Sequence, residues 1–207
     1  MSGDMASKVE QALQKDVYDL QLFLGFLKSY VMSGMQPDKQ LLLGILLQAL
    51  PRFHTSDFSA CISLIPSHVQ DASYIEKELG LIYDLENYLS CGRFTQFWEV
   101  WREADSSLEA RPSFEPHMRA AILTVVASTL EQIQTTRLAV YLGLPEATEQ
   151  KKIQEAFQEA AQIAGENVKL VSCDDKLVVF ERRTHETPES DTSQKPLSFS
   201  RIASLVS

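Results

Sequence analysis

The stretch RFTQFWEVW, from Arg93 to Trp101, holds both tryptophans of the chain. Its aromatic residues recur at i, i+3, i+4 and i+7, which is the spacing of one face of an α-helix. These residues are Phe94, Phe97, Trp98 and Trp101. The pattern predicts an amphipathic helix whose aromatic face is buried in a core. An aromatic cage for a cation or a base is the alternative that the stretch leaves open.

A second predicted helix leads directly into this stretch, from Tyr74 to Cys91. Its apolar face consists of Ile75, Leu79, Ile82, Leu85 and Leu89. Gly92 lies between the two helices and is suited to end the first one in the left-handed conformation. Helices joined by so few residues fold back on each other. We therefore expect the aromatic face to pack against the apolar face of the preceding helix.

The residues before this helix pair also show helical periodicity. One long helix is expected from Lys8 to Ser33, with Val17 and Val31 on its inward face. A second helix is expected after Asp38, whose side chain is suited to cap it. No strict sequence period is present. The pattern predicts a mainly α protein with a degenerate antiparallel helical-repeat domain, similar to HEAT or TPR arrays, over residues 1–112.

The pattern changes after residue 112. Three helices are expected, from His117 to Gln132, over residues 136–144, and from Thr148 to Ala164, the last with Ile163 inward. Two strand-like segments follow, at residues 168–172 and 176–182, with a tight turn between them. Three helices followed by a small β-hairpin is the order of a winged helix. The sequence therefore predicts a winged-helix domain over residues 113–183.

A polar segment begins the last part of the chain, residues 184–207, and predicts a flexible tether. Near its end, apolar residues recur at helical spacing: Phe199, Ile202, Leu205 and Val206. A short amphipathic helix is a poor folding unit alone, and such helices often dock in a groove of a partner. The stripe is therefore a candidate partner-binding tail. The alternatives are that it packs on its own domain or stays disordered.

Charge and motif content argue against several function classes. The net charge of −9 disfavours binding to a phosphate backbone. The sequence has no glycine-rich phosphate loop, no GxSxG turn and no metal-ligand spacing among its three cysteines and four histidines. The most apolar run, Leu41 to Leu50, is too short to cross a bilayer, and the N-terminus does not resemble a secretory signal. We expect a cytoplasmic protein that is not an enzyme and uses no cofactor or metal.

The predicted third helix of the winged helix is the element that would read DNA. Lys151 and Lys152 lie at its start, but Glu155 and Glu159 share it. Non-specific DNA affinity comes mainly from phosphate contacts, so a mixed-charge helix is a weak nucleic-acid binder. A protein-binding winged helix fits these residues better than a DNA-binding one.

A helical array followed by an acidic winged helix resembles the PCI scaffold family. Members of that family are subunits of the proteasome lid, the COP9 signalosome and eukaryotic translation initiation factor 3. Residues 18–30, 46–65 and 82–101 resemble the k-type subunits of the initiation factor. Ser56 looks like an insertion, and residues after Arg182 carry no matching pattern. Residues 138–145, LAVYLGLP, resemble the small signalosome subunit, which is the alternative.

The resemblance implies a non-catalytic scaffold subunit of translation initiation factor 3. Such a subunit acts through protein contacts, chiefly with the l subunit, and reaches the small ribosomal subunit and mRNA through the assembled complex. C-terminal helices of the subunits gather into a bundle, which would suit the amphipathic tail. A regulatory winged-helix protein that binds nucleic acid directly is a further alternative.

Overall fold

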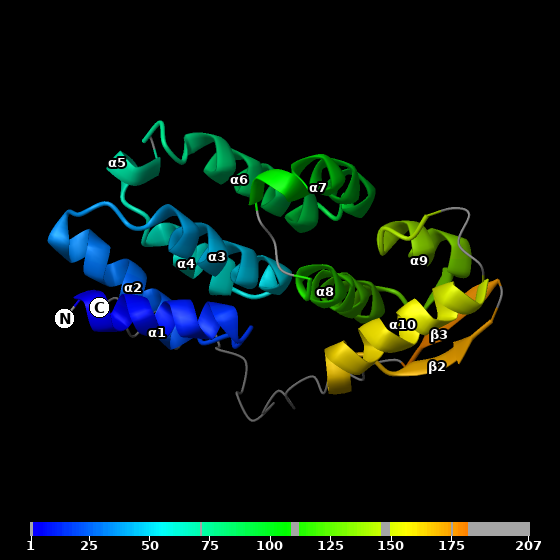
Figure 1. Cartoon of the computed structure of the whole chain (residues 1–207). Coiled ribbons are helices and arrows are strands. Elements are labelled where there is room, and N and C mark those ends of the chain that lie inside the picture. The colour runs from blue at the N-terminus through cyan, green and yellow to red at the C-terminus, as the bar shows by residue number, and fades with distance from the viewer. Residues whose placement is uncertain (1, 71, 109–111, 146–149, 175, 182–207) are drawn as a thin grey trace, which may run out of the picture.

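The computed structural model describes residues 2–70, 72–108, 112–145, 150–174 and 176–181. Helices dominate these ranges, and a small antiparallel sheet lies at the end of the molecule far from α1 (Figure 1). The α-helices are α1 (Ser2–Gln14), α2 (Leu20–Ser33), α3 (Lys39–Ala49), α4 (Asp57–Ser63), α5 (Ser67–Gln70), α6 (Glu76–Ser90), α7 (Phe94–Leu108), α8 (Phe114–Thr129), α9 (Thr135–Tyr141) and α10 (Gln150–Ala164). The strands are β1 (Gln132–Gln134), β2 (Leu170–Cys173) and β3 (Leu177–Phe180), and 3₁₀ turns cover Leu50–Arg52 and Gly165–Asn167.

The long first helix predicted from Lys8 to Ser33 is wrong, because the chain breaks it into α1 and α2. Asp16 adopts a left-handed backbone with φ of 54°, which aspartate tolerates better than most residues. Asp19 then caps α2, since its carboxylate accepts a hydrogen bond from the Leu22 amide at 3.0 Å. The two helices lie side by side as a hairpin (Figure 1).

This break changes which apolar residues face the core. Val17 lies in the turn and is 53% exposed, and Val31 near the end of α2 is 48% exposed. Both were expected to point inward. The turn takes Val17 off the helical stripe, whereas Phe23 and Leu27 of that stripe are buried together with Phe26. Val31 lies on the same helix as Phe23 and Leu27, so the break does not account for its exposure.

The helix α3 lies in the middle of the helical array and is buried on most of its circumference. Asp38 caps it as predicted, accepting from the Leu41 amide at 3.1 Å. A Cβ atom at Gly44 would lie 2.8 Å from a methyl group of Leu13. Glycine at this position therefore allows α1 to approach α3 closely.

The pair α6 and α7 folds back on itself, as the sequence predicts. Gly92 ends the first helix with φ of 69°, in the left-handed region that favours glycine. The two helices pack along their lengths. The apolar face of α6 is buried against α7, with Leu79, Ile82, Leu85 and Leu89 each at most 1% exposed.

The sheet has three strands rather than the two of the predicted hairpin. The strand order is β1-β3-β2, with antiparallel pairs throughout. The helix predicted to reach Gln132 ends at Thr129, and the next residues form β1 against β3. The strand β1 forms by pairing with a strand more than 40 residues later in the chain. The local spacing of apolar residues cannot predict such a pairing.

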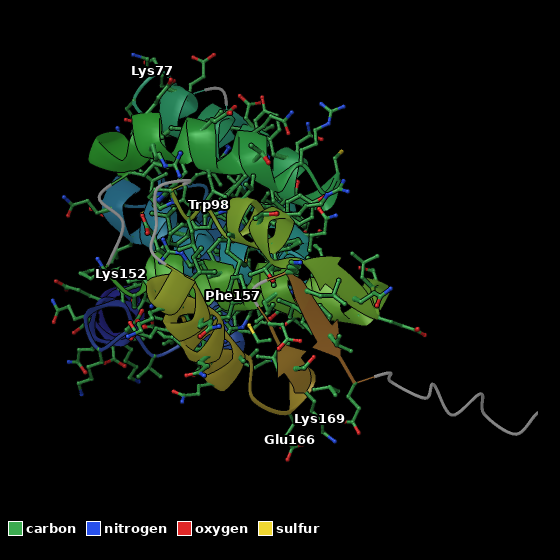
Figure 2. All side chains as sticks on the ribbon, turned by 90° about the vertical axis from the view of Figure 1, so that its right-hand side faces the viewer. Lys77, Trp98, Lys152, Phe157, Glu166 and Lys169 are labelled. Carbon is green, nitrogen blue, oxygen red and sulfur yellow. The ribbon has the colours of Figure 1, made fainter. Side chains whose placement is uncertain are left out.

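The helix α10 packs across α8, and Phe157 fills the space between them with 0% exposure. Figure 2 shows Phe157 and Trp98 inside the molecule and Lys152, Glu166 and Lys169 at its surface. One apolar cluster continues from α1 through α7 and α8 to β3. The helical array and the sheet-bearing region therefore share a single core, and the predicted domain boundaries stay predictions.

Candidate protein-interaction surfaces

The aromatic face of α7 is the centre of the core. Phe94, Phe97, Trp98 and Trp101 are at most 5% exposed. The Trp101 ring stacks on Phe114 with ring centroids 4.2 Å apart, and Phe97 meets Trp98 edge to face at 5.1 Å. Because the rings pack on each other and are buried, they are closed to a cation or base from solvent. The four residues hold α7 to its neighbours and do not form a ligand cage.

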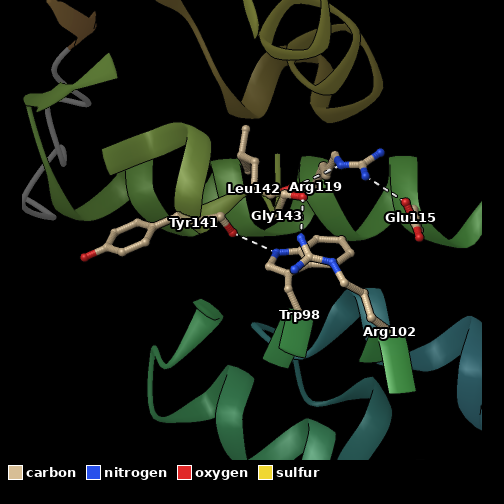
Figure 3. Close-up of polar contacts among 7 residues, drawn as sticks. All are labelled: Trp98, Arg102, Glu115, Arg119, Tyr141, Leu142 and Gly143. Atoms are coloured by element: carbon tan, nitrogen blue, oxygen red, sulfur yellow. Dashed lines mark hydrogen bonds and ion pairs between the residues drawn. The ribbon is translucent and has the colours of Figure 1, made fainter. Parts of the chain in front are cut away.

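A polar junction joins α7 and α8 to the end of α9 (Figure 3). Three consecutive carbonyls there accept hydrogen bonds from side chains of the other two helices. Trp98 Nε1 donates to the carbonyl of Tyr141 at 2.9 Å. Arg119 Nε donates to that of Leu142 at 3.1 Å, and Arg102 donates to that of Gly143 at 3.0 Å.

This junction supplies hydrogen-bond donors to the carbonyl groups at the end of α9. The last carbonyls of a helix have no intrahelical partner, and cationic groups are favoured beside them. Arg119 also pairs with Glu115 at 2.7 Å, and its guanidinium lies 5.3 Å from the centroid of the Trp98 ring. Helical spacing placed Trp98 in the core but gave no sign of the roles of Arg102 and Arg119. Neither arginine lies near residues 141–143 in sequence, so no local pattern marks them.

In the described part of the chain, the titratable side chains around Cys61 do not form a reaction centre. Cys61 is buried, and burial, helped by the nearby Asp57 carboxylate, raises the pKa of its thiol to about 11. Tyr18 donates to Asp57 at 2.9 Å, and Arg52 stacks 3.5 Å from the centroid of its ring. These contacts tie the turn after α1 to α4. Over the described ranges, no group of three His, Cys, Asp or Glu side chains is placed to hold a metal.

The basic residues of α10 are exposed but share the surface with acids. Lys151 and Lys152 lie at its start, with Glu155 following one turn later, all exposed. On the sheet, Lys169 pairs with Glu181 at 3.2 Å. Ile163, expected to point inward from α10, is 39% exposed, so that expectation is wrong. A surface of mixed charge fits a protein partner better than a phosphate backbone.

Among the exposed large apolar side chains, three gather around one turn and another lies on the sheet. Val31, Met32 and Met35 lie around the turn from α2 to α3, with Met32 80% exposed. Val171 on β2 is 65% exposed and sits at a register shift between Leu170 and Ser172. Exposed apolar side chains that gather in one place mark a candidate contact site on a protein surface. The first group was missed from sequence, since helical spacing placed Val31 on a buried stripe.

A groove of about 770 Å³ lies beside α3, between α1 and the start of α8.

The predicted partner-binding tail, with Phe199, Ile202, Leu205 and Val206, lies outside the described residues. No helix among the residues that the structure describes is both long enough and apolar enough to span a bilayer.

Comparison with known proteins identifies a matching family model and several relatives. The family model described as CSN8/PSMD8/EIF3K matches residues 37–162, from the α2–α3 turn into α10. A Danio rerio protein named "Eukaryotic translation initiation factor 3 subunit K" is 29% identical over 143 residues, covering 69% of this chain and 64% of that protein. The Homo sapiens protein of the same name is 30% identical over 135 residues, covering 65% and 60%.

A more distant relative shows a longer match. The Dictyostelium discoideum protein of the same name is 27% identical over 176 residues, which is 83% of this chain and 70% of that protein. For the vertebrate relatives, the match spans less than two thirds of their own length.

Proposed function

Because the chain belongs to the CSN8/PSMD8/EIF3K family, we propose that it is a non-catalytic scaffold subunit of eukaryotic translation initiation factor 3. The observation that carries this proposal is the similarity to proteins named as its subunit K in a fish, a mammal and an amoeba. In this role the chain acts in the cytoplasm through protein contacts. Those contacts support recruitment of the small ribosomal subunit and mRNA by the assembled factor.

The arrangement of elements supports a finer architectural proposal. We interpret α1–α7 as a degenerate helical-repeat domain and α8–α10 with the small sheet as a winged helix. The proposed boundaries are residues 1–112, 113–183 and a tail of residues 184–207. The polar junction at Trp98 would then set the orientation of the winged helix on the helical array. A fixed orientation suits a scaffold subunit, because different partners can then bind the helical array and the winged helix at the same time.

The proposed partners are other subunits of the initiation factor, chiefly the l subunit. Exposed Val171 belongs to β2 and exposed Met32 to the end of α2. These two elements lie at opposite ends of the molecule (Figure 1), so the two residues offer separate apolar contacts. The stripe formed by Phe199, Ile202, Leu205 and Val206 is proposed as a further contact with a partner helix. Pull-down of the l subunit by a chain that ends at Pro188 tests this contact. Undiminished capture would remove the tail from the proposal.

Affinity purification from cells tests the function itself. A tagged copy of the chain is expected to co-purify with the other subunits of initiation factor 3, identified by mass spectrometry. Subunits of the COP9 signalosome in their place would assign the chain to the alternative complex. Loss of the initiation factor subunits on substitution of exposed Val171 by aspartate would localise the contact. An isosteric Val171→Thr control keeps the strand propensity and should retain them.

Direct nucleic-acid binding is the competing function and has its own test. The net charge of −9 and the mixed charges of α10 argue against it. We expect no electrophoretic shift of RNA or DNA at micromolar concentrations of the purified chain. A shift at these concentrations that weakens steeply with added salt would favour the nucleic-acid-binding regulator instead.

A further inference from the structure

The groove beside α3 has an apolar floor and a polar rim. Residues of α3 that line it recur at helical spacing, including Gln40, Gly44, Leu47 and Gln48. Leu13 from α1 and Phe114 from α8 line it from either side. A hollow of about 770 Å³ that follows residues 40–48 along one face of α3 can receive the apolar face of a second helix.

The rim formed by α1 and the turn after it carries two carboxylates. Glu10 accepts a hydrogen bond from the Gln14 amide at 3.3 Å, and Asp16 accepts one from the Gln48 amide at 3.0 Å. Both partners are neutral, and within the described ranges neither carboxylate has an ion-pair partner. On the opposite rim, Lys39 and Glu78 neutralise each other at 2.7 Å. Arg52 also lines the groove, with its guanidinium 3.5 Å from the centroid of the Tyr18 ring. The groove therefore favours a positive charge on the occupant beside Glu10, away from Arg52.

One polar atom of the groove residues is left without a partner. The side-chain oxygen Oε1 of Gln48 is buried and accepts no hydrogen bond from any residue that the structure describes. A buried acceptor of this kind normally has a donor, and leaving it unpaired is costly. An occupant with hydroxyl or guanidinium donors would satisfy it.

We propose that this groove is the docking site for residues 197–206 of the same chain, bound as an amphipathic helix. This segment contains the four apolar residues of the predicted tail, and Arg201 is its one charged residue. In a helix Arg201 lies at i, i+4 from Leu205, at the flank of the apolar stripe. The guanidinium is then placed to meet Glu10 and Asp16, while the stripe covers the floor. Three serines in the segment supply hydroxyl donors for Gln48.

The length of the chain permits this docking. Residues 182–196 separate the last described residue of the sheet region from the segment, and this stretch spans up to roughly 50 Å when extended. A domain of this size has a radius of gyration of only about 17 Å. A helix of about ten residues is about 15 Å long and is marginal in water by itself. Stable helical structure in this segment would therefore report docking.

Hydrogen exchange of the full chain, read by mass spectrometry, tests the proposal without reference to any partner. Backbone amides of residues 200–206 should exchange at least about tenfold more slowly than in an unstructured peptide. Phe199→Ser together with Ile202→Ser should abolish that protection and leave the core of the protein unchanged. The protection should not depend on protein concentration, because the contact is within one chain.

Charge reversal identifies the groove as the site. Glu10→Lys should reduce the protection of residues 200–206 about two- to fivefold, as expected for loss of an exposed ion pair. Arg201→Glu should restore it in the Glu10→Lys background, whereas either change alone weakens it. Glu99→Lys makes the same charge change on an exposed site of α7 outside the groove and should have no effect.

Three outcomes would overturn the proposal. They are unprotected amides in the unmodified chain, protection that rises with protein concentration, and protection that ignores Glu10→Lys. The second would assign the groove to a second copy, and the third would place the tail elsewhere. Each is measured on the purified chain, so none depends on the proposed role in translation initiation. A partner helix that binds the same apolar stripe must compete with the groove for these residues.

Discussion

The indole of Trp98 lies so close to Gly143 that a Cβ atom at residue 143 would be 2.6 Å from Trp98 Cγ. The backbone of Gly143 has φ of 68°, a conformation that favours glycine. Trp98 belongs to α7 in the helical array, and Gly143 follows α9 beside the sheet. The two halves of the chain therefore meet through a contact that only a residue without a side chain allows.

Substitution of Gly143 by alanine should be strongly destabilising. The left-handed backbone costs about 1–2 kcal/mol with a Cβ present, and forcing Trp98 aside adds about 1–3 kcal/mol. Gly92→Ala is the matched control, since Gly92 has φ of 69° but a Cβ added there would meet no atom within 4 Å. The Gly92→Ala variant should lose only the about 1–2 kcal/mol that the left-handed backbone costs. Urea unfolding followed by tryptophan fluorescence measures both, and equal losses would contradict the contact.

Arg119 should matter more for stability than its ion-pair partner. Arg119→Met removes the donor to the Leu142 carbonyl, and an unsatisfied carbonyl costs about 1–3 kcal/mol. Glu115→Gln removes only the charge of a carboxylate whose side chain is 44% exposed, which is worth about 0–1 kcal/mol. Thermal unfolding by calorimetry compares them. A larger effect of Glu115→Gln would mean that the ion pair, not the helix-end contact, stabilises the junction.

The three cysteines should react in a fixed order. Cys91 is exposed, Cys173 is partly buried, and Cys61 is buried with its pKa raised to about 11. Only the thiolate reacts, so Cys61 should resist iodoacetamide near neutral pH in the native protein. Peptide mass spectrometry should find modification at Cys91 first and at Cys61 only after urea unfolding. Rapid native labelling of Cys61 would show that α4 opens from the core.

Mild acid should destabilise the protein through His54. Partial burial, reinforced by the Arg52 charge, lowers the pKa of its imidazole from the ordinary 6.5. The unfolded chain then binds the proton at higher pH than the folded one does, so stability is present above about pH 6.5 and is lost as the pH falls toward the folded value. The effect is small because His54 is exposed. His54→Gln should flatten the pH dependence of urea midpoints between about pH 7.5 and 5.5; an unchanged slope would exclude His54.

Local sequence patterns predicted the parts of this fold that depend on neighbouring residues. The spacing of Phe94, Phe97, Trp98 and Trp101 predicted a buried face on α7, and Gly92 predicted the sharp turn before it. Asp38 was predicted as a helix cap. Each of these features depends on the period of a helix or on the backbone preference of one residue. Such information is complete within a few positions of the chain.

Other features were wrong or missed because competing local signals look alike. The apolar period through Val17 predicted one helix, but the turn at Asp16 and the cap at Asp19 divide it. Both signals were present, and only the packing of α2 back on α1 decided between them. The strand β1 has three residues, too few to show a period, and exists through its pairing with β3.

The amino-acid sequence by itself determined that the chain is mainly helical, which faces of α6 and α7 are buried, and which family it resembles. Tertiary structure decided how α7 meets the end of α9, because Arg102 and Arg119 reach carbonyls 41 and 23 residues away. It also decided that a groove with a charged rim exists beside α3. Contacts between distant residues form only after the helices pack, and no spacing along the chain records them.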